Sequence, residues 1–177
     1  MKYFFKYRNK SKVLAIILLV ATLCSLPACV SSGNTATSVD IVKAITASEI
    51  GLPAGKLYSS SAREGESGYI SESLLNSLFG NGSRPALLDG WIDYAFFMPT
   101  SSHPCEFVAI LCDTPTTATD TARLLCARLN TIKRVKTDSQ YAHYLDNAEV
   151  TICRNYVLLI ISSDTEAAKK TAISMVK

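Results

Sequence analysis

Hydrophobic and polar positions follow two different periods along this chain, and the change of period divides its folded part into two segments. Between residues 38 and 90, apolar residues recur every three or four positions, as they do on one face of an amphipathic helix. From Trp91 onward, short runs rich in aromatic and β-branched residues predict strands. The pattern therefore predicts an N-terminal helical segment over 38–90, followed by a body of strands and helices over 91–177.

The N-terminal segment contains two predicted helices. The first has Ser38 as its expected N-cap and ends before Gly51. The second is short, spans 72–79 and stops at a Gly-Asn-Gly turn. Residues 57–68 between them are polar and carry little information about structure. The apolar stripe of the first helix consists of Ile41, Val42, Ile45 and Ile50.

The body has the order strand, strand, helix, used twice. A six-residue loop separates the strands of the first pair, and Arg154-Asn155 forms a tight turn in the second pair. The first helix is opened either by Thr114 with Pro115 or by the capping box Thr117-x-x-Asp120, and a box at Ser163 opens the last helix. The four predicted strands are 91–98, 105–112, 150–153 and 156–161.

A gapless alignment of Phe107 with Tyr156 superposes the two halves of the body, either as an internal repeat or by chance. The ββαββα order predicts an α+β fold with an antiparallel sheet of about four strands and both helices on one face. The strands 107–112 and 156–161 are nevertheless apolar on both faces, so the second face also needs a cover. We expect the segment 39–79 to cover it, with Ile41, Ile45 and Ile50 in contact; a partner protein is the alternative.

The first thirty residues have the pattern of an export signal. Five basic residues precede the apolar run 13–23, and the run is followed by Leu26-Pro27-Ala28-Cys29. Leu-x-Ala-Cys resembles the lipobox of bacterial lipoproteins, in which the new N-terminal cysteine carries diacylglycerol. We therefore predict a signal peptide over 1–28, lipid on Cys29, a flexible tether over 29–37 and one domain over 38–177. An uncleaved anchor and simple secretion are the alternatives.

The charge of the chain changes once the leader is set aside. The sequence has 18 basic and 15 acidic residues; five basic and no acidic residues precede Cys29, which leaves 13 − 15 = −2. A domain of this charge lacks the basic surface that nucleic-acid binding needs, so no nucleic-acid partner is expected. The basic residues that include Arg123, Arg128 and Lys133 are interpreted as the solvated face of one helix.

Few residues offer catalytic chemistry. The sequence has two histidines, and His103 with Cys105 is the one pair that could act as base and thiol nucleophile. Pro104 stiffens the segment between them and no spacing favours a third member of a triad, so we predict that this pair is not catalytic. No zinc, haem or nucleotide motif is present, and no catalytic, metal or cofactor residue is predicted. Glu106 and Tyr156 are interpreted as a strand-edge carboxylate and a tyrosine at the rim of the core.

The mature chain has four cysteines besides Cys29. Export permits disulfides, but two of the four align with apolar residues of the other half of the body, which favours buried thiols. If a disulfide forms, Cys105 with Cys126 is the expected pair. The four residues are Cys105, Cys112, Cys126 and Cys153.

The order of these elements resembles a family of small lipoproteins from Gram-positive, mainly clostridial, bacteria, domain of unknown function 4358. The resemblance covers about 39–176 and rests on Glu106, Tyr141, Ala148 and the run 156–159. Members usually carry Gly at the last hairpin turn, where this chain has Arg154. The family implies an envelope location but no activity, cofactor or catalytic residue, and its association with envelope O-acylation genes points to the cell wall.

The sequence thus predicts an extracytoplasmic lipoprotein, held at the outer face of the cytoplasmic membrane by lipid on Cys29. Its domain is expected to bind or scaffold an envelope protein partner without catalysis. The alternative is an accessory enzyme or a structural subunit of a cell-wall modification system of the O-acylation type.

Overall fold

The computed structural model describes residues 36–79, 86–135 and 139–176. The predicted signal peptide, Cys29 and most of the tether lie outside the described residues. No helix in the described part of the chain is long and apolar enough to cross a membrane.

The fold is α+β and is built on a five-stranded antiparallel sheet. The strand order is β1-β2-β3-β5-β4, so β3 is the central strand and β1 and β4 form the two edges. The sequence predicted about four strands; β1, whose last three residues lie in the polar segment 57–68, was not among them, and it pairs along its whole length with β2. The strands are β1 (Gly55–Ser59), β2 (Trp91–Pro99), β3 (Glu106–Cys112), β4 (Glu149–Cys153) and β5 (Tyr156–Ile161).

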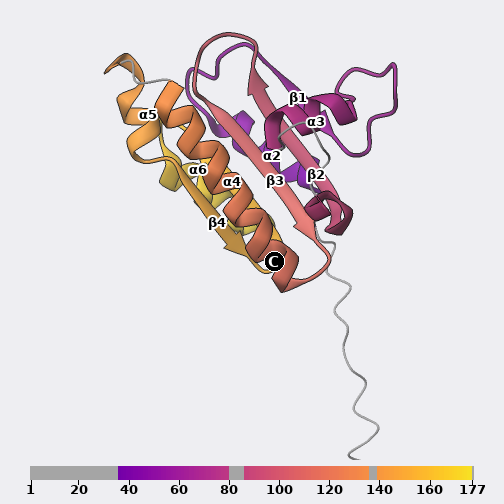
Figure 1. Cartoon of the computed structure of the whole chain (residues 1–177). Helices are drawn as coiled ribbons and strands as arrows, with labels where there is room; N and C mark the ends of the chain where they lie inside the picture. The colour runs from indigo at the N-terminus through magenta and orange to yellow at the C-terminus, as the bar shows by residue number, and fades with distance from the viewer. Residues whose placement is uncertain (1–35, 80–85, 136–138, 177) are drawn as a thin grey trace, which may run out of the picture. The chain divides into compact units, whose positions relative to one another are not determined.

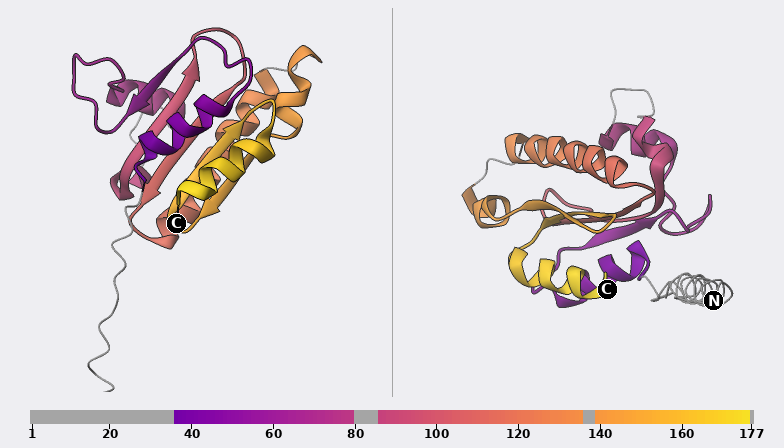
Figure 2. Two further views of the ribbon diagram at one scale, coloured as in Figure 1. Left: turned by 180° about the vertical axis from the view of Figure 1, so that it is seen from behind. Right: turned by 90° about the horizontal axis from the view of Figure 1, so that it is seen from below.

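Helices cover both faces of the sheet (Figures 1 and 2). One face carries α2 and α6, which pack against each other, and the other carries α3 and α4. A short helix, α5, precedes β4, and 3-10 turns lie at 86–90 and 139–141. The helices are α2 (Ser38–Ser48), α3 (Glu72–Phe79), α4 (Pro115–Val135), α5 (Ala142–Asp146) and α6 (Thr165–Met175).

The expectation that both helices of the body share one face is wrong, because α4 and α6 lie on opposite faces (Figure 2). The expectation followed from treating the two halves as a symmetric repeat. β3 and β5 are adjacent and antiparallel, so a repeat would relate them by a twofold axis perpendicular to the sheet, and this axis would put α4 and α6 on the same face. Both strands are buried on both faces, and each face therefore needs a helical layer.

Helix α2 shares the cover of its face with α6. Ile41, Val42 and Ile45 are buried, and α2 contacts β2 and β3. Two details of the prediction are wrong: Thr37 is the N-cap, in a capping box with Asp40, and the helix ends at Ser48. Because the backbone is already extended at Glu49, Ile50 leaves the apolar stripe and is 87% exposed. Only part of the segment 39–79 covers this face, since α3 lies on the other one.

The turn between β4 and β5 holds Arg154 in the left-handed backbone region, with a φ of 54°. A non-glycine residue in that region costs about 1–2 kcal/mol, and glycine is normal at the first position of such a two-residue turn. We therefore expect Arg154→Gly to raise the free energy of unfolding by up to about 1 kcal/mol, after the entropy cost of glycine is subtracted. Urea denaturation measures the change, and Arg154→Val is the control that should lower it. A loss of stability on Arg154→Gly would contradict the strain.

Candidate functional site

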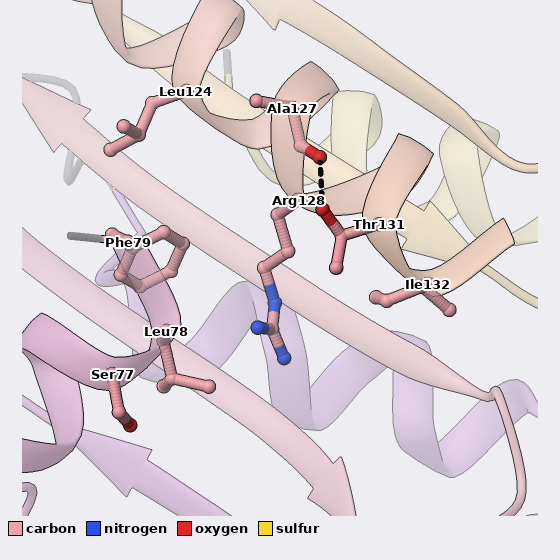
Figure 3. Close-up of a pocket in the computed structure, with 8 residues that line it drawn as sticks. All are labelled: Ser77, Leu78, Phe79, Leu124, Ala127, Arg128, Thr131 and Ile132. Carbon is pink, nitrogen blue, oxygen red and sulfur yellow. Dashed lines mark hydrogen bonds between the residues drawn. The ribbon is translucent and has the colours of Figure 1, made fainter. Parts of the chain in front are cut away.

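A groove of about 310 Å³ runs between α3 and α4 on one face of the domain (Figure 3). Leu78 and Phe79 of α3 form one wall, and Leu124 and Ile132 of α4 form the other. Apolar side chains thus contribute to both walls, and Ser77, Arg128 and Thr131 add polar groups. The residues that line the groove are Ser77, Leu78, Phe79, Leu124, Ala127, Arg128, Thr131 and Ile132.

Arg128 lies at the centre of the groove and is held by Glu106. The Nε and Nη2 atoms of Arg128 donate to the two carboxylate oxygens of Glu106, at 2.6 and 2.7 Å. Glu106 is the first residue of β3 and points to the face that carries α4, as do Val108 and Cys112 two and six positions later. The pair is almost buried, with side-chain exposures of 15% for Arg128 and 6% for Glu106. A bidentate pair of this kind fixes the plane of the guanidinium.

The remaining donors of Arg128 are directed at the groove. The guanidinium lies 5.6 Å from the ring centre of Phe79, and Figure 3 shows the side chain reaching from α4 into the space beside Leu78 and Phe79. No described residue accepts a hydrogen bond from Nη1 of Arg128. The groove thus combines apolar walls with N–H donors whose positions are fixed by Glu106.

A second hollow, of about 190 Å³, lies on the other side of Arg128. Arg128 and Ile132 line both hollows, and the second one is completed by the β2–β3 loop, including Ser101 and His103. A ligand longer than a single side chain could therefore contact the guanidinium from both sides.

His103 and Cys105 are neighbours, but their contact does not activate the thiol. The backbone N–H of Cys105 donates to Nδ1 of His103, at 3.1 Å. The Cys105 side chain is fully buried, and burial, with smaller effects of the Glu49 and Glu106 charges, raises the pKa of its thiol to about 12. Since the thiolate is the reactive species, this thiol is a poor nucleophile at neutral pH. The His103 ring packs against Tyr141 and Tyr144, with ring centres 5.0 and 4.7 Å away.

All four described cysteines are free thiols, and their surroundings differ. Cys105 and Cys112 are buried, as the sequence predicted, whereas Cys153 is half-buried. The prediction that Cys126 is buried is wrong, because it lies on the exposed side of α4. Cys105 and Cys126 are not bridged in this structure.

We expect iodoacetamide to label Cys126 in the folded protein and Cys105 only after unfolding, as measured by peptide mass mapping.

The pKa of the Cys105 thiol rises from 9.0 to about 12 on folding, so the unfolded chain loses this proton first. The contribution of Cys105 to stability is therefore present below pH 9 and is lost as the pH rises toward 12. Compared with Cys105→Ala, the native chain should lose stability more steeply in that range. Equal slopes, or rapid labelling of Cys105, would contradict this environment.

A second polar cluster joins the end of α2 to the start of α6. The Glu49 carboxylate accepts hydrogen bonds from the hydroxyl of Ser162 at 2.5 Å and from the backbone N–H and hydroxyl of Ser163 at 3.0 and 2.8 Å. Burial, followed by the charge of Glu49, raises the pKa of the nearby Tyr144 hydroxyl. Ser162 is completely buried and also accepts from the backbone N–H of Asp164. This cluster holds α2 and α6 together.

Glu106 and Tyr156 both have structural partners. Glu106 is not an edge residue, since it begins the central strand and pairs with Arg128. The hydroxyl of Tyr156 donates to the backbone carbonyl of Ala36, at 2.5 Å. Burial, followed by the charge of Asp93, raises the pKa of this hydroxyl.

Sequence reasoning missed Arg128, which it had placed on a solvated helix face. Arg128 lies three residues after Leu125 and four before Ile132, so it borders the apolar stripe of α4. The available signal was Glu106, because a carboxylate that opens a strand buried on both faces needs a cationic partner.

Comparisons with known proteins give no relative. No protein-family model, no curated protein and no solved structure matches this chain.

The described residues contain no group of three or more His, Cys, Asp or Glu side chains that could hold a metal ion.

Proposed function

We propose that this chain is an extracytoplasmic lipoprotein whose domain binds an envelope protein through the groove between α3 and α4. The observation that carries the proposal is the fixed guanidinium of Arg128 between the apolar side chains of Leu78, Phe79 and Ile132. Apolar walls with a few well-placed polar groups are typical of binding sites. The lipid on Cys29 and the location at the outer face of the cytoplasmic membrane rest on the sequence of the leader.

The groove favours a neutral hydrogen-bond acceptor over an anion. Glu106 compensates the charge of Arg128, so a bound carboxylate would gain little net attraction. A backbone carbonyl can accept from Nη1 while an adjacent apolar side chain packs on Phe79 or Leu124. We therefore expect the partner to present a short peptide segment with an apolar side chain.

The groove can be blocked without disturbing the ion pair. Ala127 is exposed and lines the groove, so Ala127→Trp should fill it. Ala47→Trp places the same side chain on an exposed position of α2, on the opposite face, and is the matched control. Proteins that copurify with the full chain from solubilised membranes are compared by mass spectrometry. A partner retained by Ala47→Trp and lost by Ala127→Trp supports the proposal; partners that bind both variants equally contradict it.

The anchor is tested separately. Cys29→Ala should release the protein into the medium or leave the precursor uncleaved, and the mature native chain should carry the mass of a lipid. Unchanged mass and unchanged membrane retention on Cys29→Ala would contradict lipidation. The rival interpretation, an accessory enzyme, requires an activity on an envelope substrate that Ala127→Trp abolishes.

A further inference from the structure

Strand β4 is an edge of the sheet that can accept another strand. It pairs with β5 on one side, and no backbone group of another described element bonds to its other side. Ile152, the fourth of the five residues of β4, is 45% exposed. An edge of this kind is a ready template for pairing with a further strand.

The β4–β5 turn determines which residues of β4 direct their backbone N–H and C=O groups to the open edge. Cys153 and Tyr156 flank a two-residue turn, so they form a hydrogen-bonded pair. Hydrogen-bonded and non-hydrogen-bonded pairs alternate along an antiparallel ladder. Ile152 and Val150 therefore occupy non-hydrogen-bonded pairs with β5, and their N–H and C=O groups point to the open edge.

The two edges of the sheet differ in their protection. Lysine and glycine occupy the first two positions of β1, and such residues discourage strand pairing. Between Glu149 and Arg154, β4 has neither a charged residue nor a proline. Its central residues are Val150, Thr151, Ile152 and Cys153.

We propose that β4 pairs antiparallel with β4 of a second copy of this chain, about a twofold axis at Thr151. In this register Val150 of each copy bonds to Ile152 of the other, and the two Thr151 residues face each other in a non-hydrogen-bonded pair. The exposed Ile152 side chains then pack against Val150. The twofold axis closes the assembly at two copies.

Charge favours the second copy in this orientation. β4 begins with Glu149, which pairs with Lys169 of its own chain at 3.0 Å, and is followed by Arg154, so antiparallel pairing places the two Arg154 charges at opposite ends of the joined edge. Parallel pairing would place the two Arg154 side chains side by side. The antiparallel orientation therefore avoids repulsion between the two Arg154 side chains.

Helix α4 leaves room for the second copy. It contacts β4, and its side opposite Arg128 carries the small residues Thr119, Ala122 and Cys126, spaced to lie in one row. Small side chains let two helices approach closely above the joined strands. The groove lies on the other side of α4, so pairing leaves it open.

Disulfide cross-linking of the full chain in its membranes tests the register. Opposed residues of a non-hydrogen-bonded pair have Cα atoms about 4.5 Å apart, within the range that a disulfide spans. Thr151→Cys should therefore give a covalent dimer under mild oxidant, well above the amount formed by the native chain. Lys56→Cys, on the exposed edge strand β1, is the matched control and should not exceed that background. Equal amounts from both variants, or a cross-link from position 151 to another protein, would overturn the proposal.

A second variant separates pairing from folding. Ile152→Lys puts a charge on the open edge, and it should abolish the cross-link of Thr151→Cys and raise the dimer dissociation constant roughly tenfold or more. The mass of the detergent-solubilised protein gives its oligomeric state, and circular dichroism shows that the variant keeps its fold. A native chain with the mass of one copy, or an Ile152→Lys variant that dimerises as before, would refute the pairing. If Ile152→Lys unfolds, the mass of the native chain and the cross-link of Thr151→Cys against Lys56→Cys decide the question.

Discussion

Glu106→Ala is expected to lower the free energy of unfolding by about 3–5 kcal/mol, because it leaves the Arg128 guanidinium buried without its partner. Arg128→Ala should cost a similar amount, since it leaves the carboxylate uncompensated. Urea denaturation at neutral pH measures both. Arg123→Ala is the matched control on the same helix: Arg123 pairs with Asp120 but is 75% exposed, so it should change stability by less than about 1 kcal/mol.

Replacing both Glu106 and Arg128 separates the effect of the ion pair on stability from its effect on partner binding. Glu106→Leu combined with Arg128→Met restores apolar packing, and such replacements are often neutral. The double variant should therefore be more stable than either single variant. It should still lose the partner that binds the groove, because it has no N–H donors there. Single variants that cost less than about 1 kcal/mol would show that the pair is solvated in solution.

Ile45→Ala is expected to cost about 2–5 kcal/mol, whereas Ile50→Ala should leave stability unchanged within about 0.5 kcal/mol. The two residues lie five positions apart and were expected to serve the same stripe, but Ile45 is 1% exposed and Ile50 is 87% exposed. The large cost comes from the cavity that truncation leaves between α2 and the sheet. The same denaturation experiment measures both variants.

The result also tests which element covers this face of the sheet. Equal effects of Ile45→Ala and Ile50→Ala would mean that α2 continues past Ser48 in solution and that the face is covered differently. Binding of a hydrophobic dye to Ile45→Ala, with none to Ile50→Ala, would show that the exposed surface is the one that α2 normally buries.

Much of the sheet could be predicted from the sequence, because strands that are buried on both faces leave a strong apolar signal. β3 and β5 are such strands, and the turn at Arg154-Asn155 was located correctly. β1 could not be found in this way, because it is a short edge strand of mixed polarity that is stabilised by pairing with β2. Local pattern says little about such strands.

The placement of α6 could not be derived from local pattern either. The amphipathic pattern of a helix shows which of its sides is buried, but it does not show which face of the sheet the helix covers. The position of Arg128 in the groove could not be predicted either, because its partner Glu106 lies 22 residues away in the sequence. The non-catalytic reading of His103 and Cys105 stays a prediction; the structure adds that the thiol is buried and that its neighbour accepts a backbone N–H.

The hydrogen bond from Tyr156 to the carbonyl of Ala36 has a mechanical consequence. Tension applied through the residues before position 36 reaches β5 as well as α2, because this bond ties the entrance of the domain to a strand in the interior of the sheet. The capping box of Thr37 and Asp40 shares that load at the first turn of α2. We therefore expect a force at the N-terminal end to meet resistance from β5 and α2 together.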